Sequence, residues 1–148
     1  MQHTVYISDV IDAPVEDVWN ILRDFNGLAK FHPGILTSKV ENDLLNNAVG
    51  SIRHLTFEAG FVREKLLMLD DLLHAFTYSI LETTMPVCNY LAGVKLYRVT
   101  KSARTFCEWW ADFDVIDADK AALAAFIGEN VFKVGFEAIG SLCQKISK

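Results

Sequence analysis

The sequence predicts an α+β fold in which a curved antiparallel sheet wraps around one long C-terminal helix. Between residues 36 and 115, apolar and polar residues alternate and short turns intervene, which is typical of consecutive hairpin strands. Over residues 117–147, apolar residues instead recur at helical spacing. A helix of about 30 residues is about 45 Å long. Its broad apolar face requires a large concave surface to cover it.

The N-terminal part combines one strand with two short helices. Alternation from Val5 to Ile11 predicts the first strand. Pro14 is tolerated in the first turn of a helix, so we expect a helix over residues 14–24. Asn26-Gly27 interrupts it, and a second short helix is expected over residues 28–31.

The central part reads as strands throughout. Their unbroken hairpin succession implies an antiparallel meander, which the first strand extends to seven strands. At 148 residues without a repeat or linker, we expect residues 1–148 to form a single domain. The expected strands lie near residues 36–43, 50–58, 61–71, 74–84, 89–100 and 104–115.

The C-terminal segment has the signals of an amphipathic helix. Asp117 and Asp119 supply a cap and first-turn negative charge. Gly128 and Gly135 remove bulk from its buried side, and we expect a cavity beside them. The predicted apolar stripe consists of Ala124, Ile127, Val131, Val134, Ala138 and Leu142, widened by Phe132, Phe136, Ile139 and Cys143.

Composition excludes several functional classes. Hydrophobic residues make up 51% and charged residues 22% of the chain, as in an ordinary globular protein. The net charge of −5 and the lack of a basic stripe argue against nucleic-acid binding. No apolar run reaches the ~18 residues of a membrane span, and residues 1–6 lack the regions of a signal peptide. Three cysteines without a CxxC pair predict reduced thiols and a cytoplasmic location.

Alternation also predicts which strand residues point toward the helix. Two of them, Arg53 and Glu64, are charged. A buried carboxylate without a partner is unfavourable, so we predict that Glu64 pairs with Arg53. The pair is either a structural ion pair or a ligand anchor or acid–base group. The other inward positions are Leu55, Phe57, Val62, Leu66, Met68, Phe76, Tyr78, Ile80, Tyr90, Ala92, Val94 and Leu96.

Sequence motifs for cofactors and metals are missing. The chain has no GxSxG, HExxH, P-loop or dinucleotide fingerprint. His3, His54 and His74 lack metal-ligand spacing, so we expect neither a metal nor a cofactor. His32 precedes Pro33-Gly34 and either caps local backbone or anchors a ligand. Enzyme chemistry would require Glu64, Glu108, His32 or the tyrosines as general acids and bases.

Two stretches of sequence resemble a known superfamily. The first is Ile11-Asp12-Ala13-Pro14 with Val18-Trp19, Asp24-Phe25 and Phe31-His32-Pro33. The second comprises Gly50, Arg53, Glu64-Lys65-Leu66, Leu69-Asp70-Asp71, Phe76-Thr77-Tyr78-Ser79-Ile80, Pro86-Val87, Asn89-Tyr90, Glu108-Trp109 and Phe113-Asp114. Together they resemble the START-like ligand-binding superfamily, also called SRPBCC. It includes bacterial polyketide cyclase/dehydrase-like proteins, plant abscisic-acid receptors and the birch-pollen-allergen fold. The resemblance implies a helix-grip fold that encloses a pocket for apolar small molecules.

Carried over by position, the resemblance implies site residues. His32 falls where the plant receptors have a cavity lysine that meets the hormone carboxylate, and Glu64 and Glu108 fall on cavity glutamates. The receptors' gating loop is shortened here to Glu58-Ala59-Gly60, so hormone sensing is not expected. Implied wall positions are Tyr78, Ile80, Val87, Tyr90 and Ala92 on the sheet, and Ile127, Val131 and Gly135 on the helix.

Two arguments predict opposite orientations for the last strand, residues 104–115. Alternation of Cys107, Trp109, Ala111 and Phe113 places these residues inside and Glu108 outside. The resemblance instead implies that Glu108 and Trp110 face the cavity, and a β-bulge would partly reconcile the two. We adopt the resemblance and expect Glu108 and Trp110 among the ligand-binding residues.

Three functions remain compatible with the sequence. We favour binding or transport of a small apolar or amphipathic molecule between sheet and helix, oriented by His32, Arg53 and Glu64. One alternative is an aromatase/cyclase- or dehydratase-type enzyme that uses cavity carboxylates as general acid and base. Another is a lipid or quinone chaperone that docks to a partner protein or membrane surface. The ligand's identity and the oligomeric state stay open, with a homodimer among the states allowed.

Overall fold

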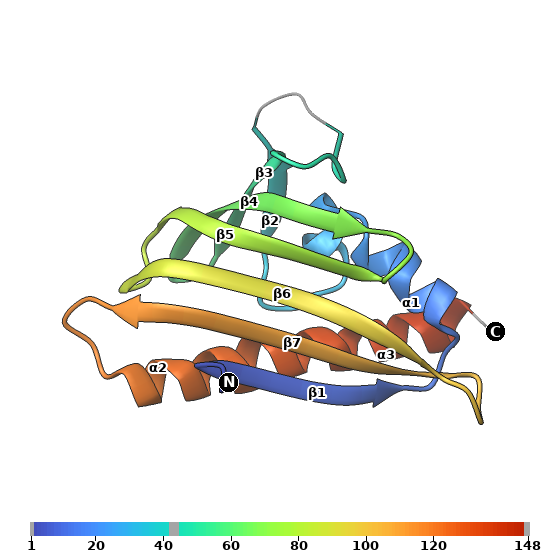
Figure 1. Cartoon of the computed structure of the whole chain (residues 1–148). Coiled ribbons are helices and arrows are strands. Elements are labelled where there is room, and N and C mark those ends of the chain that lie inside the picture. The colour runs from blue at the N-terminus through green and yellow to red at the C-terminus, as the bar shows by residue number, and fades with distance from the viewer. Residues whose placement is uncertain (1, 42–44, 147–148) are drawn as a thin grey trace.

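The computed structural model describes residues 2–41 and 45–146, and these contain one seven-stranded antiparallel sheet that curves around a C-terminal helix (Figure 1). The strands are β1 (Val5–Ile11), β2 (Thr37–Val40), β3 (Ile52–Phe57), β4 (Gly60–Asp70), β5 (Ala75–Thr83), β6 (Val87–Val99) and β7 (Arg104–Val115). Their order is β1-β7-β6-β5-β4-β3-β2, so β1 closes the meander beside β7. The predicted α+β class and antiparallel sheet are confirmed. Residues 42–43 of the expected strand 36–43, and residue 147 of the expected helix, lie outside the described residues.

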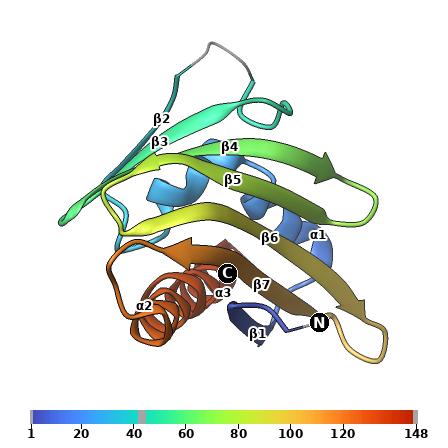
Figure 2. The same ribbon diagram turned by 60° about the vertical axis from the view of Figure 1, so that its left-hand side comes forward.

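The helices lie on the inner side of the curved sheet, as Figure 2 shows. Three consecutive elements, α2 (Lys120–Ile127), the π-helical turn η2 (Gly128–Phe132) and α3 (Lys133–Ile146), form the long C-terminal helix. Asp119 caps it by accepting a hydrogen bond from the Ala122 N–H at 3.1 Å. The shorter α1 (Val15–Leu22) packs against α3, and the 3₁₀-helix η1 (Phe25–Lys30) follows it. Pro14 precedes α1 as its N-cap, and Asn26-Gly27 lies within η1 rather than breaking a helix.

The π-helical turn moves the buried face of the C-terminal helix. Ile127 is buried before the turn, and Phe132, five residues later, is buried at its end. A π turn adds one residue to the helical repeat, so the face continues one position beyond the predicted stripe. Its centre is Phe132, Phe136, Ile139 and Cys143, while the predicted centre of Val131, Val134, Ala138 and Leu142 is half-buried at the edge.

A bulge in β4 changes which side chains face inward near its end. The β4–β5 register shifts between Leu66 and Met68. Leu66 is buried, but Met68 is exposed, and Leu69 packs against the core in its place. The expectation that Met68 points inward is therefore wrong, because an unpaired residue reverses the alternation.

Large aromatic side chains fill the space under the sheet unevenly. Trp109 stacks on Phe132 with ring centroids 4.3 Å apart and also contacts Phe136. Toward α1, Phe25 packs edge-on against Phe76. These rings fill part of the space under the sheet, and the space that remains lies beside α2 and η2.

Candidate functional site

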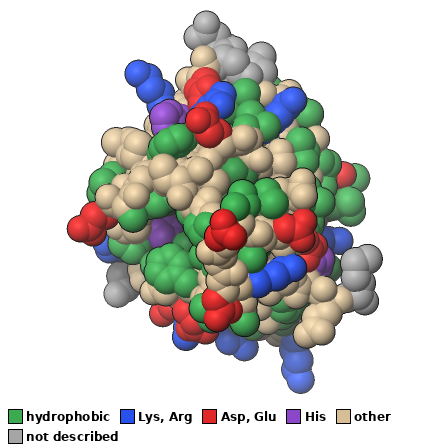
Figure 3. All heavy atoms as spheres, turned by 90° about the vertical axis from the view of Figure 1, so that its left-hand side faces the viewer, with side chains coloured by type: hydrophobic (Ala, Val, Ile, Leu, Met, Phe, Trp, Pro, Cys, Tyr) green, Lys and Arg blue, Asp and Glu red, His purple; other side chains and the backbone are tan. Residues whose placement is uncertain are grey.

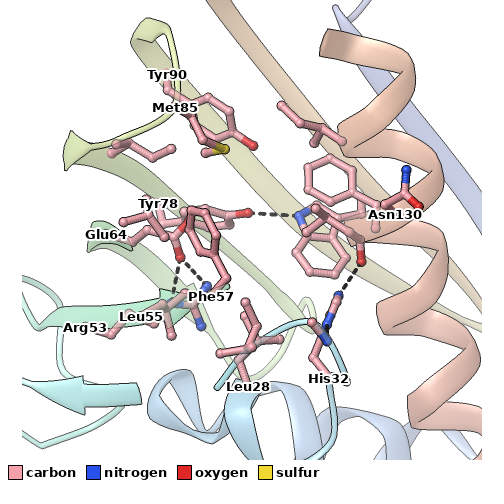
Figure 4. A pocket seen from close by; sticks show the side chains of 18 of the residues that line it. Leu28, His32, Arg53, Leu55, Phe57, Glu64, Tyr78, Met85, Tyr90 and Asn130 are labelled. Carbon is pink, nitrogen blue, oxygen red and sulfur yellow. Dashed lines mark hydrogen bonds and ion pairs between the residues drawn. The ribbon is translucent and has the colours of Figure 1, made fainter. Parts of the chain in front are cut away.

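A pocket of about 270 Å³ opens between the inner face of the sheet and the α2–η2 part of the helix (Figure 4). Ligand pockets in proteins typically span roughly 300–1,000 Å³, and this one, just below that range, suits a small molecule. The lining residues are Leu28, His32, Gly34, Ile35, Arg53, Leu55, Phe57, Val62, Glu64, Tyr78, Ile80, Met85, Tyr90, Trp109, Phe126, Ile127, Asn130, Val131 and Phe132.

The pocket brings together most of the residues expected from the sequence. Those that line it are His32, Arg53, Leu55, Phe57, Val62, Glu64, Tyr78, Ile80, Tyr90, Ile127 and Val131. Five expected residues do not: Val87, Ala92, Glu108, Trp110 and Gly135. Val87 and Ala92 are buried in the core instead. The residues that sequence reasoning missed come largely from loops and the π turn, which carry no periodic signal: Leu28, Gly34, Ile35, Met85, Trp109, Phe126, Asn130 and Phe132.

Arg53 and Glu64 form an ion pair in the pocket wall, as predicted. They are opposite each other in the β3–β4 register, and their side chains are only 4% and 9% exposed. The Arg53 Nε and Nη2 atoms lie 2.8 and 2.7 Å from Glu64 Oε1. Arg53 Nη1 donates to the Phe25 carbonyl, and the guanidinium lies 3.9 Å from the centroid of the Phe25 ring. Each nitrogen of Arg53 therefore already has an acceptor.

The second carboxylate oxygen of Glu64, Oε2, does not take part in the ion pair with Arg53. Both contacts from Arg53 reach Oε1, and within the described part of the chain Oε2 has no hydrogen-bond donor. Figure 4 shows the paired side chains at one end of the pocket. An ionised carboxylate only accepts hydrogen bonds, so Oε2 is an acceptor available to a bound molecule.

Two tyrosines provide neutral hydroxyl groups. The Tyr78 hydroxyl accepts a hydrogen bond from Trp109 Nε1 at 3.0 Å. Burial raises the pKa of Tyr78, and the charge of Glu64 raises it further. Burial also raises the pKa of Tyr90 well above its usual value, with a further contribution from Tyr78. The Tyr90 hydroxyl points into the pocket in Figure 4, so it presents an O–H group that keeps its proton.

His32 uses both ring nitrogens to hold backbone. The Gly34 N–H donates to Nδ1 at 3.0 Å, which assigns the proton of the neutral ring to Nε2. Nε2 then donates to the Val131 carbonyl at 2.8 Å. Burial lowers the pKa of His32, which favours the neutral form. This geometry matches the backbone-capping interpretation of His32 and leaves no charged group there for a ligand anion.

The expectation that Glu108 and Trp110 face the cavity is wrong. The β1–β7 register runs unbroken from Val5–Ala111 to Ile11–Thr105, so no bulge turns β7 over. Glu108 accepts a hydrogen bond from the Tyr6 hydroxyl on the outer face of the sheet. Trp110 stacks on His3 on that same face, with ring centroids 4.7 Å apart. Simple alternation gave the correct orientation, which places Trp109 in the pocket wall.

Gly135 does not border a void. A Cβ atom there would lie 2.9 Å from Trp109 Cζ3 and 3.3 Å from His32 Cδ2. The missing side chain makes room for the indole ring rather than for a ligand. The expected cavity at this glycine is therefore filled by the protein itself.

Phe126 of α2 and Asn130 of η2 border the pocket on the helix side. Phe126 is 55% exposed at this edge, and the Asn130 side-chain amide donates to the Phe126 carbonyl at 3.2 Å. Figure 3 shows the end of the molecule that carries α2 and the β5–β6 turn, where acidic and basic side chains are scattered among apolar and neutral ones. This surface offers no concentrated charge to steer a strongly charged ligand.

Other possible sites give no competing candidate. Within residues 2–41 and 45–146, no group of three or more His, Cys, Asp or Glu side chains could hold a metal ion. Cys88, Cys107 and Cys143 are free thiols, and burial raises the pKa of Cys107 to about 12, so it is a poor nucleophile. No helix in the described part of the chain is long and apolar enough to cross a membrane.

Known proteins share both the sequence pattern and the fold. The model of the family described as polyketide cyclase / dehydrase and lipid transport matches residues 2–140. The structure of XoxI from Bacillus cereus is 26% identical, with a TM-score of 0.85, and the match covers 100% of this chain and 99% of that one. An uncharacterised protein from Bacillus thuringiensis is also 26% identical, with a TM-score of 0.81 and coverage of 95% and 98%.

A more distant neighbour supports the fold alone. The Zhui aromatase/cyclase from Streptomyces sp. R1128 is 17% identical, with a TM-score of 0.81 and coverage of 99% of this chain and 96% of that one. The chain therefore belongs to the polyketide cyclase / dehydrase and lipid transport family, within the START-like superfamily that its sequence resembles.

Proposed function

We propose that this protein binds a small, largely apolar molecule in the pocket between the sheet and the α2–η2 segment, and that residues 1–148 act as one ligand-binding domain. The observation that carries the proposal is the pocket wall. It is apolar apart from one charge pair, a few hydroxyl and amide groups and a histidine, which is the composition of small-molecule sites. Family membership agrees with a role in binding apolar compounds.

The pocket chemistry favours a binding protein over a cyclase or dehydratase. General acid–base catalysis needs a group that exchanges a proton near the operating pH. Glu64 is held in an ion pair with Arg53, and both nitrogens of His32 are bonded to backbone. The pKa values of Tyr78 and Tyr90 are raised by burial, which removes them as bases. Glu108 lies on the outer face of the sheet.

Uptake of a neutral fluorescent probe, N-phenyl-1-naphthylamine, tests this proposal. Ile80 lines the pocket, whereas Leu81, the next residue of β5, does not line it and is 47% exposed. Ile80→Trp should fill the pocket and weaken probe binding by about ten-fold or more, equivalent to about 1.4 kcal/mol. Leu81→Trp adds the same indole outside and should bind the probe like the wild type. Absence of saturable binding to the wild type, or equal binding by both variants, would refute the proposal.

A further inference from the structure

We infer that the pocket selects neutral ligands that carry a hydroxyl group and rejects carboxylates of the same shape. The inference rests on the proposed binding function and specifies its ligand class. It follows from which polar atoms of the wall are already bonded and which remain available.

The basic side chains of the pocket wall already interact with other groups of the protein. Among the described residues that line the pocket, Arg53 and His32 are the ones that could carry positive charge. The Arg53 nitrogens face Glu64 Oε1 and the Phe25 carbonyl, and its guanidinium is covered by the Phe25 ring. Both His32 nitrogens bond backbone groups. A carboxylate that entered would lose its water without gaining a counter-charge, which is strongly unfavourable.

The available acceptor of the wall carries negative charge. Glu64 Oε2 has no donor within the described part of the chain, although the side chain is only 9% exposed. Hydrogen bonds to a charged acceptor are stronger than those between neutral groups. A ligand O–H that donates to Oε2 therefore gains affinity, whereas a ligand carboxylate beside it is repelled.

Tyr90 complements this acceptor with a donor. Its hydroxyl points into the same pocket and keeps its proton, because burial disfavours the tyrosinate. A ligand hydroxyl can donate its hydrogen to Glu64 Oε2, and a ligand oxygen elsewhere in the pocket can face the Tyr90 hydroxyl. The Tyr90 hydroxyl also has Tyr78 as a hydrogen-bond neighbour, so a purely apolar molecule would leave only Glu64 Oε2 without a donor.

The size of the pocket sets the size of suitable probes. A cavity of about 150 Å³ lined by apolar side chains binds benzene. The pocket volume of about 270 Å³ therefore accommodates a two-ring compound between walls such as Leu55, Ile80 and Phe132. The series 2-naphthol, naphthalene and 2-naphthoate keeps this ring system and changes only the polar group.

Competition against N-phenyl-1-naphthylamine at neutral pH tests the inference. The phenol is neutral and the carboxylate ionised under these conditions. We expect 2-naphthol to displace the probe at concentrations at least about ten-fold lower than 2-naphthoate, with naphthalene between them. Equal or tighter binding of 2-naphthoate would overturn the inference while leaving the binding function intact. If the wild type binds neither the probe nor any of the three, the binding function fails as well.

A matched pair of variants assigns the selectivity to Glu64. Glu64→Gln removes the negative charge and leaves Arg53 without its counter-ion, so the preference for 2-naphthol over 2-naphthoate should fall by about ten-fold or reverse. The control Glu82→Gln changes an exposed partner of Arg63, at 3.1 Å, and should keep the wild-type preference. If Glu64→Gln does not fold, the double variant Arg53→Met/Glu64→Leu should bind naphthalene at least as tightly as 2-naphthol. An unchanged preference in the variant that folds would overturn the inference.

Discussion

His32 Nε2 donates a 2.8 Å hydrogen bond to the carbonyl oxygen of Val131, and this contact joins the loop after η1 to the π-helical turn. The ordinary helical hydrogen-bond ladder is interrupted in a π turn, where such an external donor can satisfy a carbonyl. His32 is 2% exposed, and its other ring nitrogen, Nδ1, accepts a hydrogen bond from the Gly34 N–H. One neutral side chain thus fixes both the helix and the loop that border the pocket.

This role of His32 predicts a pH-dependent stability. Burial lowers the pKa of His32 below its usual value of 6.5, so the unfolded chain takes up the proton more readily than the folded one. Its contribution is fully present above about pH 6.5 and is lost as the pH falls through the lowered pKa. Urea denaturation should show the free energy of unfolding declining below about pH 6.5 in the wild type.

A substitution separates the contribution of His32 to this pH dependence from those of the carboxylates. Glu16 and Glu41 also have lowered pKa values, but their usual value is 4.5, so their contributions disappear at lower pH. His32→Asn should flatten the decline between about pH 6.5 and pH 5, whereas Glu41→Gln should retain it, because the contribution of Glu41 is lost only at lower pH. The assignment fails if the two variants follow the same curve.

The ion pair of Arg53 and Glu64 predicts a strong coupling between the two residues. Glu64→Leu leaves the buried Arg53 without a counter-charge and should cost about 3–5 kcal/mol of unfolding free energy. Adding Arg53→Met removes the unpaired charge, so the double variant should be more stable than Glu64→Leu, even though the Phe25 carbonyl then loses its donor. Chemical denaturation of the four proteins in the cycle gives the coupling. Additive effects would mean that the charges act independently.

Local sequence signals predicted most of the fold. Strand alternation depends only on neighbouring residues, so it located all seven strands and set the inward face at Arg53 and Leu55. It also oriented β7 correctly, whereas the positional resemblance misplaced Glu108. Related families share their fold more closely than they share the environment of a single side chain.

The predictions from the sequence that the structure contradicts share a physical cause. The bulge before Met68 and the π turn after Ile127 each depart from the regular repeat, and a periodic pattern extends across such sites without revealing them. Pocket residues in loops, such as Ile35 and Met85, have no periodicity to read. At Gly135, the sequence indicated missing bulk but not which neighbouring side chain would fill it.

The outward position of Glu108 predicts a distinctive titration of Tyr6. The hydrogen bond to Glu108, with a smaller effect of burial, raises the pKa of Tyr6 to about 12. Glu108→Gln removes the negative acceptor, so Tyr6 should ionise closer to its usual value of 10.0. Ultraviolet titration of tyrosinate, with Tyr6→Phe to identify the signal, measures the shift. If Glu108 instead lay in the pocket, Glu108→Gln would change probe uptake and leave Tyr6 unaffected.

Two glycines of α3 predict opposite effects of one added methyl group. At Gly135 a Cβ atom would lie 2.9 Å from Trp109 Cζ3, while at Gly140 the nearest atom, Ile11 Cγ2, is 4.0 Å away. The indole cannot easily move, because it stacks on Phe132 at 4.3 Å and donates its N–H to Tyr78.

Overpacking at Gly135 costs about 1–3 kcal/mol, which outweighs the gain of up to about 1 kcal/mol in helix propensity. Gly135→Ala should therefore lower the melting temperature and Gly140→Ala should raise it in thermal denaturation. If both substitutions raise it equally, Gly135 borders open space and the pocket extends farther along the helix than the wall described above.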